Sequence, residues 1–421
     1  MKVLVIGSGG REHAICWALN KSKKVDKIYC SPGNAGTDKI AINAKIDVSN
    51  FRNLEKFIKK ERIDLVIVGP EKPLVNGIVD FLEKKKIKVF GPNKYSSQLE
   101  GSKTFTKKIC DKYNIPTAKF KIIKNKNNLS KILEIFSLPI VVKADGLAAG
   151  KGVYICYHEK DLRIAINEIF KGKFGLAKKV LVEEYLDGEE MSFFIISDGK
   201  TFKVFGTAQD HKKVGEGDIG PNTGGMGSYS PSRLENKILE KKILAKIIQP
   251  TLRALKDKNN KFKGFLYAGL MIVKNEPYLI EYNVRMGDPE CQTILPRLKT
   301  DFFEIINSCI NNNLEKIDIK WSSKKSLCIV LCAKGYPGNY KSLNHINNLK
   351  KILTKKNEFI FHAGTKIKSK DVISNGGRVL NFTALSESFK LSRDRVIRLI
   401  KKLNWKNGFF RKDIGFRVID K

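Results

Sequence analysis

The sequence predicts a multidomain protein with an α/β N-terminal part and α+β parts after it, and three observations support this fold class. The first hundred residues alternate short apolar strands with helices, which is typical of a parallel sheet covered by helices on both faces. From about residue 101 short strands and glycine loops follow, and the last hundred residues carry two strands and a helix. A chain of 421 residues is long enough for about two to four such domains.

The N-terminal elements are predicted from apolar runs and from the loops that separate them. Strands are expected at residues 2–6, 27–30, 65–68 and 88–90, with a helix from about residue 12 to residue 20. Loops rich in Gly and Pro follow at residues 7–10, 31–36, 69–71 and 91–92. Because ligands of parallel sheets bind at the carboxyl ends of the strands, these loops predict a binding face.

The loop at residues 7–13 is similar to a dinucleotide-binding fingerprint but departs from it. Glu12 stands where the third glycine of the fingerprint belongs, and residues 30–34 lack the acid that would hold an adenosine ribose. A glycine turn at a helix N-terminus still offers N–H groups to a single phosphate. We therefore expect a phosphate-bearing substrate here, with an NAD-dependent oxidoreductase as the alternative.

The segment after residue 101 carries groups suited to binding phosphates. A helix over residues 102–113 ends before Ile115 and Pro116, as the restricted conformation of a residue before proline predicts. A buried strand at residues 139–146 delivers Lys143, and the Gly/Ala loop at residues 147–153 lets backbone N–H groups approach a triphosphate closely. The loop lacks the Walker A pattern, and a surface hairpin is the alternative.

Residues 180–190 form a strand that runs into an acidic turn, which suits an adenosine pocket. The exposed backbone at Glu184 and Leu186 would read the adenine edge, and Glu190 or Glu189 would accept the ribose hydroxyls. Acidic turns are common, so the pattern gains its meaning from the segments on either side.

Residues 279–290 place oxygen ligands on one face of an apolar strand. Side chains two apart in a strand point to the same side, so the Glu281 carboxylate and the Asn283 amide lie together, followed on that face by Arg285. Mg²⁺ is usually held by one or two carboxylates plus nucleotide phosphates, and an arginine can clamp phosphate or carboxylate. The pattern predicts a magnesium phosphate site, with a solvated polar strand face as the alternative.

Composition narrows the class of protein further. The formal charge of +36 raises the alternative of a nucleic-acid-binding protein, but the excess is mostly Lys spread along the chain, which favours dispersed surface charge over a binding stripe. The eight cysteines show no paired zinc spacing and are expected to be buried. Because we find neither a signal peptide nor an apolar run of about 18 residues, we expect a cytoplasmic protein without a nucleic-acid or membrane partner.

The order of the lysine strand, the glycine loop, the acidic turn and the Glu-x-Asn strand resembles that of the ATP-grasp enzymes. More narrowly, the chain resembles the phosphoribosylamine–glycine ligase family from end to end. The motifs that carry this resemblance are residues 7–13, 32–37, 68–71, 99–103, 143–152, 210–212, 220–227, 285–290 and 411–415. Val284 and Met286 differ from residues often found in relatives, but neither is a predicted ligand.

The resemblance implies an enzyme of the second step of purine synthesis. It would use ATP to join glycine to 5-phosphoribosylamine through glycyl phosphate, with Mg²⁺ or Mn²⁺ as the metal, giving glycinamide ribonucleotide, ADP and phosphate. It also implies a monomer with a Rossmann-like substrate domain at residues 1–100, an ATP-grasp domain at 101–320 that includes a mobile small subdomain at 117–187, and an α+β domain at 321–421. Another ATP-grasp carboxylate–amine ligase or a carboxylase is the alternative.

The resemblance also implies roles for individual residues. ATP would be bound by Lys103, Lys143, Gly150, Gly152, Glu183, Glu184, Leu186, Glu189 and Glu190, and the metal by Glu281 and Asn283. The two other substrates would be bound by Gly9, Gly10, Asn34, Glu71, Pro221, Asn222, Thr223, Gly224 and Gly225. Catalysis would depend on Arg285, Asp288, Asp210 and His211, with Arg285 stabilising the transferring phosphoryl group or orienting the acyl phosphate.

Overall fold

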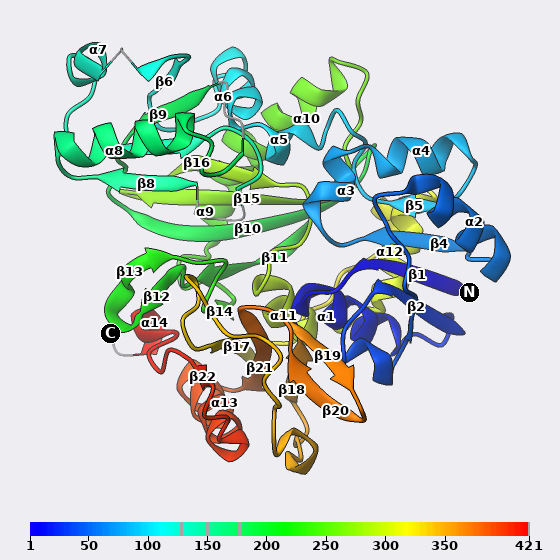
Figure 1. The fold of residues 1–421 in the computed structure, drawn as a ribbon. Helices are drawn as coiled ribbons and strands as arrows, with labels where there is room; N and C mark the ends of the chain where they lie inside the picture. Colours follow the sequence, from blue (N-terminus) through cyan, green and yellow to red (C-terminus); the bar gives the residue numbers. More distant parts are fainter. Residues whose placement is uncertain (127–128, 149–151, 176–178, 420–421) are drawn as a thin grey trace.

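The N-terminal part is a fully parallel sheet with strand order β3-β2-β1-β4-β5. The computed structural model describes residues 1–126, 129–148, 152–175 and 179–419 (Figure 1). The strands of this sheet are β1 (Lys2–Gly7), β2 (Lys27–Pro32), β3 (Ile42–Asn43), β4 (Leu65–Val68) and β5 (Val89–Phe90), and its helices are α1 (Gly10–Leu19), α2 (Phe51–Glu61), α3 (Glu71–Val75) and α4 (Ile78–Lys84). The predicted strands and first helix are confirmed to within two residues. The short strand β3 was not predicted, because two residues carry no alternation signal.

A smaller antiparallel sheet with strand order β6-β9-β7-β8 lies at the upper left of Figure 1. Its elements are β6 (Phe120–Ile123), α7 (Leu129–Leu133), β7 (Ile140–Ala144), β8 (Val153–Cys156), α8 (Glu159–Phe170) and β9 (Val180–Glu184). Leu162 and Ile166 of α8 pack with Ile140 and Val142 of β7 in a hydrophobic cluster of their own. This unit lies within the predicted small subdomain, whose mobility stays a prediction.

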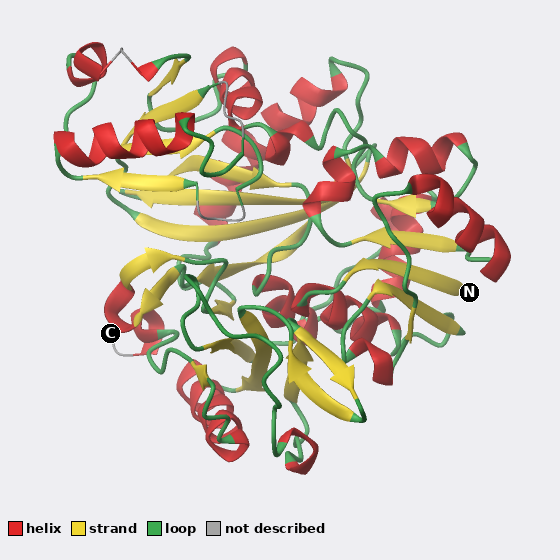
Figure 2. Ribbon diagram, viewed as in Figure 1, coloured by secondary structure: helices red, strands yellow, loops and turns green. Residues whose placement is uncertain are grey.

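The longest sheet runs from the middle of the chain into its C-terminal part, with strand order β16-β15-β10-β11-β14-β17-β21-β18 and β22 beside β17 (Figure 2). Its strands are β10 (Glu189–Asp198), β11 (Phe202–Asp210), β14 (Gly227–Ser230), β15 (Lys263–Val273), β16 (Glu276–Asn283), β17 (Lys325–Ala333), β18 (Glu358–His362), β21 (Arg378–Ser386) and β22 (Gly408–Phe409). The four-residue strand β14 pairs with both β11 and β17. Strands on both sides of the predicted domain boundary near residue 320 therefore belong to one continuous sheet.

The remaining helices and two hairpins surround these sheets. They are α5 (Gln98–Gly101), α6 (Lys103–Lys112), α9 (Lys237–Ile243), α10 (Gln249–Lys256), α11 (Glu290–Ile294), α12 (Phe302–Ile310), α13 (Phe389–Leu403) and α14 (Phe416–Ile419), with the hairpins β12 (Lys213–Gly215)/β13 (Ile219–Asn222) and β19 (Thr365–Lys368)/β20 (Asp371–Ser374). Helix α6 begins as predicted, because the Ser102 hydroxyl caps it by accepting the Phe105 N–H at 3.1 Å. In the described ranges, no helix combines the length and apolar character that a membrane span requires.

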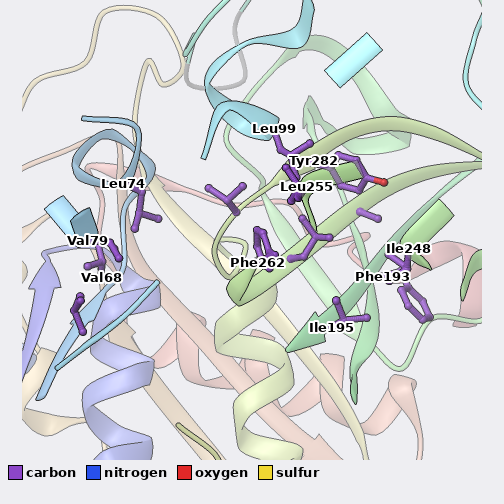
Figure 3. Close-up of a cluster of buried hydrophobic side chains, with 14 of the residues drawn as sticks. Val68, Leu74, Val79, Leu99, Phe193, Ile195, Ile248, Leu255, Phe262 and Tyr282 are labelled. Carbon is purple, nitrogen blue, oxygen red and sulfur yellow. The ribbon is translucent and has the colours of Figure 1, made fainter. Parts of the chain in front are cut away.

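The hydrophobic core joins the N-terminal sheet to the long sheet. Figure 3 shows Leu74 and Val79 of the N-terminal part in the same cluster as Leu99, Phe193 and Tyr282. Each fully buried side chain of this size contributes about 1.5–3 kcal/mol of stability. The two parts are therefore packed as one body, which fixes the side chains at the ends of their strands relative to one another. All eight cysteines are free and buried, as predicted.

Two buried histidines connect the N-terminal and C-terminal parts. The backbone N–H of His362 donates to Nδ1 of His13 at 2.8 Å, so His13 must be unprotonated at that nitrogen. Nδ1 of His362 lies 3.0 Å from the hydroxyl oxygen of Thr365. Burial, helped by the positive charge of Lys39, lowers the pKa of His13 to about 3. Burial is also the main cause that lowers the pKa of His362 well below its usual value, and the charges of His13 and Lys39 add to it.

Acid is expected to destabilise this contact. An unfolded histidine binds its proton near its ordinary pKa of 6.5 while folded His13 binds it only at about 3, so stability is lost as pH falls through that window and is unchanged above it. We expect His13 alone to account for about 2 kcal/mol of lost stability at pH 5. Denaturant unfolding of the wild type and of His13→Gln at pH 5 and pH 7.5 measures it. The variant should lose less stability between the two pH values, and an equal loss would contradict the assignment.

Candidate active site

A cleft of about 970 Å³ is lined by residues from the N-terminal part, the small sheet, the long sheet and the C-terminal part. It collects most of the predicted site residues. These are Gly9, Glu71, Lys103, Lys143, Glu183, Glu184, Leu186, Glu190, Asp210, Asn222, Thr223, Gly224, Glu281, Asn283, Arg285 and Asp288. The other predicted residues that the structure describes lie outside the lining, namely Gly10, Asn34, Gly152, Glu189, His211, Pro221 and Gly225. Gly150 falls outside the described residues.

Lysine side chains cluster where helix α6 meets the small sheet. Lys143 on β7 donates from Nζ to Glu183 Oε2 at 2.9 Å and to the Ile280 carbonyl at 3.3 Å. Lys107 lies 3.3 Å from the same Glu183 carboxylate, and Lys103 donates to the Gly146 carbonyl at 3.0 Å. Burial lowers the pKa of both Lys103 and Lys107. Several ammonium groups facing one cleft form a site suited to a polyphosphate.

Lys107 was missed by the sequence reasoning. It lies one helical turn after Lys103, a spacing that puts both side chains on one face of α6, and this spacing would have predicted it. Glu183, predicted as an ATP-binding residue, is buried between Lys107 and Lys143. Its carboxylate therefore anchors the lysines, while the backbone that follows it continues along the cleft at Glu184 and Leu186.

The Lys212 ammonium group links the acidic turn to β16, the strand that carries the predicted metal ligands. The Lys212 ammonium lies 3.0 Å from Glu190 Oε2 and 3.8 Å from Glu281 Oε1. Burial raises the pKa of Glu281, but the ammonium groups of Lys212, Lys103 and Lys143 outweigh burial and leave that pKa lowered. Glu281 is therefore an ionised carboxylate beneath a cationic cluster. Lys212 was seen only as part of a motif, since nothing in the sequence showed that it would reach these carboxylates.

The predicted metal ligands lie together on β16. Glu281 pairs with Gly269 and Asn283 with Tyr267 on the neighbouring strand, and both side chains line the cleft. Within the described part of the chain, no group of three or more His, Cys, Asp or Glu side chains forms a metal cage. A lone ionised carboxylate beside an amide oxygen fits Mg²⁺ or Mn²⁺, which take their remaining ligands from phosphates and water.

Arg285 is held by two carboxylates from the N-terminal half. Its Nη2 donates to Glu100 Oε1 at 2.7 Å, and its Nε lies 3.2 Å from Glu71 Oε2. Glu100 also accepts the Val284 N–H at 2.8 Å. Burial raises the pKa of Glu100 to about 7, against the opposing charge of Arg285. Glu100 was not predicted as a site residue, because the contact joins residues far apart in sequence.

An arginine of the C-terminal part reaches the opposite side of the cleft. Arg378 on β21 donates from Nη1 to the Asp288 carbonyl at 2.6 Å and also to the Gly224 carbonyl. Its Nη2 lies 3.4 Å from Asp288 Oδ1, while Asp288 Oδ2 accepts the Arg11 N–H at 3.2 Å. Arg378 thus fixes both the loop at Gly224 and Asp288. No motif pointed to it, and only the pairing of β21 with β17 brings it to the site.

Asp210 has a buried carboxylate oxygen and belongs to the lining of the cleft. Its Oδ1 is buried and makes no hydrogen bond to any described residue. Burial, with the nearby charge of Glu290, raises the pKa of Asp210 well above its usual value. Gly225 has a φ of +110°, and a side chain there would put Cβ 2.8 Å from Asp210 Oδ1. Gly225 therefore keeps the loop close to Asp210, although it does not line the cleft.

His211 and Glu189 point away from the cleft. Nε2 of His211 accepts the Gly415 N–H at 3.2 Å, and burial lowers the His211 pKa to about 4. Glu189 accepts hydrogen bonds from Arg233 Nε and from Gln209 Nε2, each at 2.7 Å. Consecutive residues of a strand face opposite sides, so Glu190 enters the cleft and Glu189 does not. These contacts are structural and give no support to a catalytic role for His211.

Two N–H groups at the glycine turn after β1, those of Gly9 and Arg11, donate to carboxylates. The Gly9 N–H donates to Glu12 Oε2 at 2.6 Å, and a Cβ at Gly69 would lie 2.1 Å from Glu12 Oε1. Glu12 therefore occupies the space that the third glycine of a dinucleotide fingerprint keeps open, which disfavours NAD. The turn offers no free N–H at Gly9 or Arg11 for the phosphate that we expected there.

Gly10 and Asn34 connect the N-terminal and C-terminal parts instead of facing the cleft. A Cβ at Gly10 would lie 2.3 Å from Nδ2 of Asn381. The Asn34 amide donates to the Ser8 carbonyl at 2.8 Å and to the His362 carbonyl at 2.9 Å. The lining also includes polar residues of the N-terminal part that the sequence reasoning missed, namely Ser8, Asp47, Ser49, Lys72 and Asn76.

A lysine-bearing small sheet that shares a cleft with a Glu-x-Asn strand of a larger antiparallel sheet defines an ATP-grasp enzyme. Family models described as the N domain, the ATP-grasp (A) domain and the C domain of phosphoribosylglycinamide synthetase match residues 1–100, 101–291 and 326–417. The chain belongs to this family, the phosphoribosylamine–glycine ligases, as its motifs predicted.

Individual relatives match this chain over nearly their whole lengths. The chain is 44% identical to phosphoribosylamine–glycine ligase of Brucella melitensis, covering 100% of this chain and 99% of that one. It is also 44% identical to the ligase of Caldanaerobacter subterraneus, covering 99% of each. The crystal structure of the Thermotoga maritima ligase superposes with a TM-score of 0.86 at 32% identity, covering 98% of this chain and 100% of that chain. A biotin carboxylase of Campylobacter jejuni shares the fold alone, with a TM-score of 0.75 at 16% identity, covering 100% of this chain and 95% of that chain.

Proposed function

We propose that this chain uses ATP to ligate glycine to 5-phosphoribosylamine, giving glycinamide ribonucleotide, ADP and phosphate. The observation that carries the proposal is a single cleft of about 970 Å³ to which all parts of the chain contribute, in a protein whose full-length relatives are ligases of that name. Lysines, an acid–amide pair and an unpaired carboxylate share this cleft, so it offers separate places for a nucleotide, a metal and an amino group.

The reaction needs two displacements. The glycine carboxylate attacks the γ-phosphorus of ATP and ADP leaves, forming glycyl phosphate. The amine of 5-phosphoribosylamine then attacks the acyl carbon and phosphate leaves. Because no covalent enzyme nucleophile is required, the residues contribute position and charge.

The nucleotide is assigned to the small-sheet side of the cleft. Lys103 and Lys143, joined by Lys107, face the phosphates, and the backbone near Leu186 faces the adenine. Glu190 is the carboxylate for the ribose hydroxyls, since Glu189 is turned away. Glu281 and Asn283 would hold Mg²⁺ or Mn²⁺, which when bound neutralises phosphate charge. Arg285, beside Glu71 and Glu100, stabilises the transferring phosphoryl group.

Glycine is assigned to the side formed by Asp210 and the loop at 222–224. A zwitterion needs an anion for its ammonium group, and Asp210 Oδ1 is an unpartnered acceptor in the lining. An arriving ammonium group would also hold Asp210 in its charged form. The phosphoribosyl group is assigned to Glu71 and the other polar lining residues of the N-terminal part. A monomeric, cytoplasmic enzyme with the predicted domain division completes the proposal.

A steady-state assay of ADP release tests the proposed function. ADP should form only when ATP, a divalent metal, glycine and freshly prepared 5-phosphoribosylamine are all present. Bicarbonate with biotin replaces glycine and the amine in a parallel reaction and should give no turnover. Equal ADP release with bicarbonate and biotin would reject the ligase in favour of a carboxylase. Tight NADH binding measured by fluorescence would favour an oxidoreductase instead.

A further inference from the structure

The C-terminal motif Arg-Lys-Asp-Ile-Gly at residues 411–415 has no part in the reaction above, yet it contacts the wall of the cleft. The wall segment is the hairpin β12/β13, which begins directly after Lys212 and leads into Asn222, Thr223 and Gly224. Figure 1 places this hairpin next to α14, which follows the motif. The two segments are separated by about 200 residues of sequence, so their contact is a feature of the tertiary fold.

Arg411 makes the central contacts. Its side chain is 1% exposed, and its Nε and Nη2 donate to the two oxygens of Asp413 at 2.8 and 2.6 Å. Its Nη1 donates to Asp218 Oδ1 at 2.7 Å and to the Lys213 carbonyl at 2.9 Å. One guanidinium therefore joins the motif to both the first strand and the turn of the hairpin.

Further bonds run along the same contact. The Gly217 N–H donates to Asp413 Oδ2 at 2.8 Å, and the Lys412 N–H donates to Glu216 Oε1 at 3.0 Å. At the base of the hairpin, His211 accepts the Gly415 N–H. We call this set of contacts, from His211 to Asp218 on one side and from Arg411 to Gly415 on the other, the clasp.

Besides the clasp, the hairpin is held by Arg417, which pairs with Asp218, and by Val214, which packs against the C-terminal hydrophobic cluster. Two-stranded hairpins are marginally stable in water, and β13 of this one begins with Ile219, which is 67% exposed, so the hairpin depends on such contacts for its order. Buried ion pairs contribute little net stability, but they fix geometry, and the planar arginine fork suits several fixed acceptors at once. Thr223 continues this order by donating its N–H to the Lys212 carbonyl at 2.8 Å.

We propose that Arg411 is a positioning residue that acts through the hairpin, holding Lys212 and residues 222–224 at the glycine side of the cleft. This inference rests on the proposed function for its kinetic readout, but the order of the hairpin can be measured without it. Lys212 also pairs with Glu190, the carboxylate assigned to the ATP ribose, but the lysines assigned to the phosphates, Lys103, Lys107 and Lys143, make no bond to the clasp among the described residues. Loss of the clasp should therefore affect glycine more than ATP.

Two variants test the clasp. Arg411→Lys keeps the charge but cannot bridge three acceptors, and Asp413→Asn, outside the cleft lining, removes the charge and one of the two oxygens that accept from Arg411 and Gly217. Each should raise the KM for glycine at least about tenfold and the KM for ATP by less than about twofold. Hydrogen exchange of peptides covering residues 213–223 should accelerate in both variants. Asp413→Asn decides the question if Arg411→Lys does not fold.

Arg398→Gln is the matched control. Arg398 lies in the same C-terminal part and pairs with the buried Glu358, but it does not touch the hairpin. It should lower Tm without changing the KM for glycine or the exchange of residues 213–223. A purely structural role for Arg411 would give that same result in Arg411→Lys and overturn the proposal. If the wild type turns over without glycine, the proposed function fails. The clasp is tested separately, and it would be rejected if hydrogen exchange at residues 213–223 were unchanged in both clasp variants.

Discussion

Arg285→Lys is expected to lower kcat by about 10²- to 10³-fold while changing the KM for ATP by less than about threefold. Arg285 is oriented by Glu100 at 2.7 Å and Glu71 at 3.2 Å, whereas the lysines that face the nucleotide are held by Glu183 and by the Gly146 carbonyl. A guanidinium held in place by two carboxylates needs no reorganisation when charge moves onto the transferring phosphoryl group. Lysine keeps the charge that Glu100 requires but cannot contact both carboxylates and the substrate together. Steady-state ADP release with each substrate varied in turn measures the effect.

The control for Arg285 is another buried arginine away from the cleft. Arg297 is 9% exposed and donates to Ser230 Oγ at 2.8 Å and to the Lys324 carbonyl at 3.1 Å. Arg297→Lys should lower Tm and leave kcat within about twofold, because it disturbs packing without touching the lining. A large rise in the KM for ATP in Arg285→Lys, with kcat unchanged, would move Arg285 to nucleotide binding.

The parts of the site that were predicted correctly are those whose geometry is local. The alternation of Glu281 and Asn283 follows from the strand period alone, and both line the cleft as expected. The same period decides between Glu189 and Glu190, but only once one knows which face of β10 is covered. The sequence left both open, and the bond between Glu189 and Arg233 resolves the choice.

The parts that were not predicted depend on distant pairing. Arg378 reaches Asp288 only because β14, four residues long, joins β11 to β17 and so carries β21 to the cleft. A strand of that length shows no alternation from which to predict it. The contacts of Glu100 and Asn34 were not predicted for the same reason. Each makes its decisive bond to a residue in another part of the chain, and single-sequence patterns do not report such contacts.

The glycine turn shows that a motif can identify a family without fixing the role of each residue in it. A Gly-x-Gly-Gly turn before a helix suggests free N–H groups, yet Glu12 of the same motif accepts the Gly9 N–H. Neither Gly9 nor Gly10 could take a side chain without a contact of 2.9 Å or less. Gly10 therefore packs closely against Gln292 and Asn381, while Gly9 packs against Glu12 and still lines the cleft, and the family resemblance could not distinguish these two positions.

Glu281→Gln is expected to lower kcat/KM for ATP by about 10³-fold and to raise the metal concentration needed for half-maximal rate. Glutamine keeps the size of the side chain and loses its charge, while Lys212 retains Glu190 at 3.0 Å, so the fold should survive. The lowered pKa of Glu281 leaves its carboxylate ionised near neutral pH. Titration of Glu281 should therefore not weaken metal binding by the wild type between pH 8 and pH 6. Binding of Mn²⁺ to the enzyme with ATP, followed by electron paramagnetic resonance, measures the metal directly.

Glu276→Gln separates loss of a ligand from loss of a charge on the same strand. Glu276 begins β16 and pairs at the surface with Lys246 at 2.7 Å, far along the strand from Glu281. Exposed pairs contribute about 0–1 kcal/mol, so this variant should bind Mn²⁺ and turn over as the wild type does. Should Glu281→Gln also bind Mn²⁺ normally, the metal must be held elsewhere, and Glu281 would act instead by holding Lys212 in the cleft. A weakened Mn²⁺ signal in Glu281→Gln alone would place the metal on β16, because the two variants differ only in which end of the strand loses its charge.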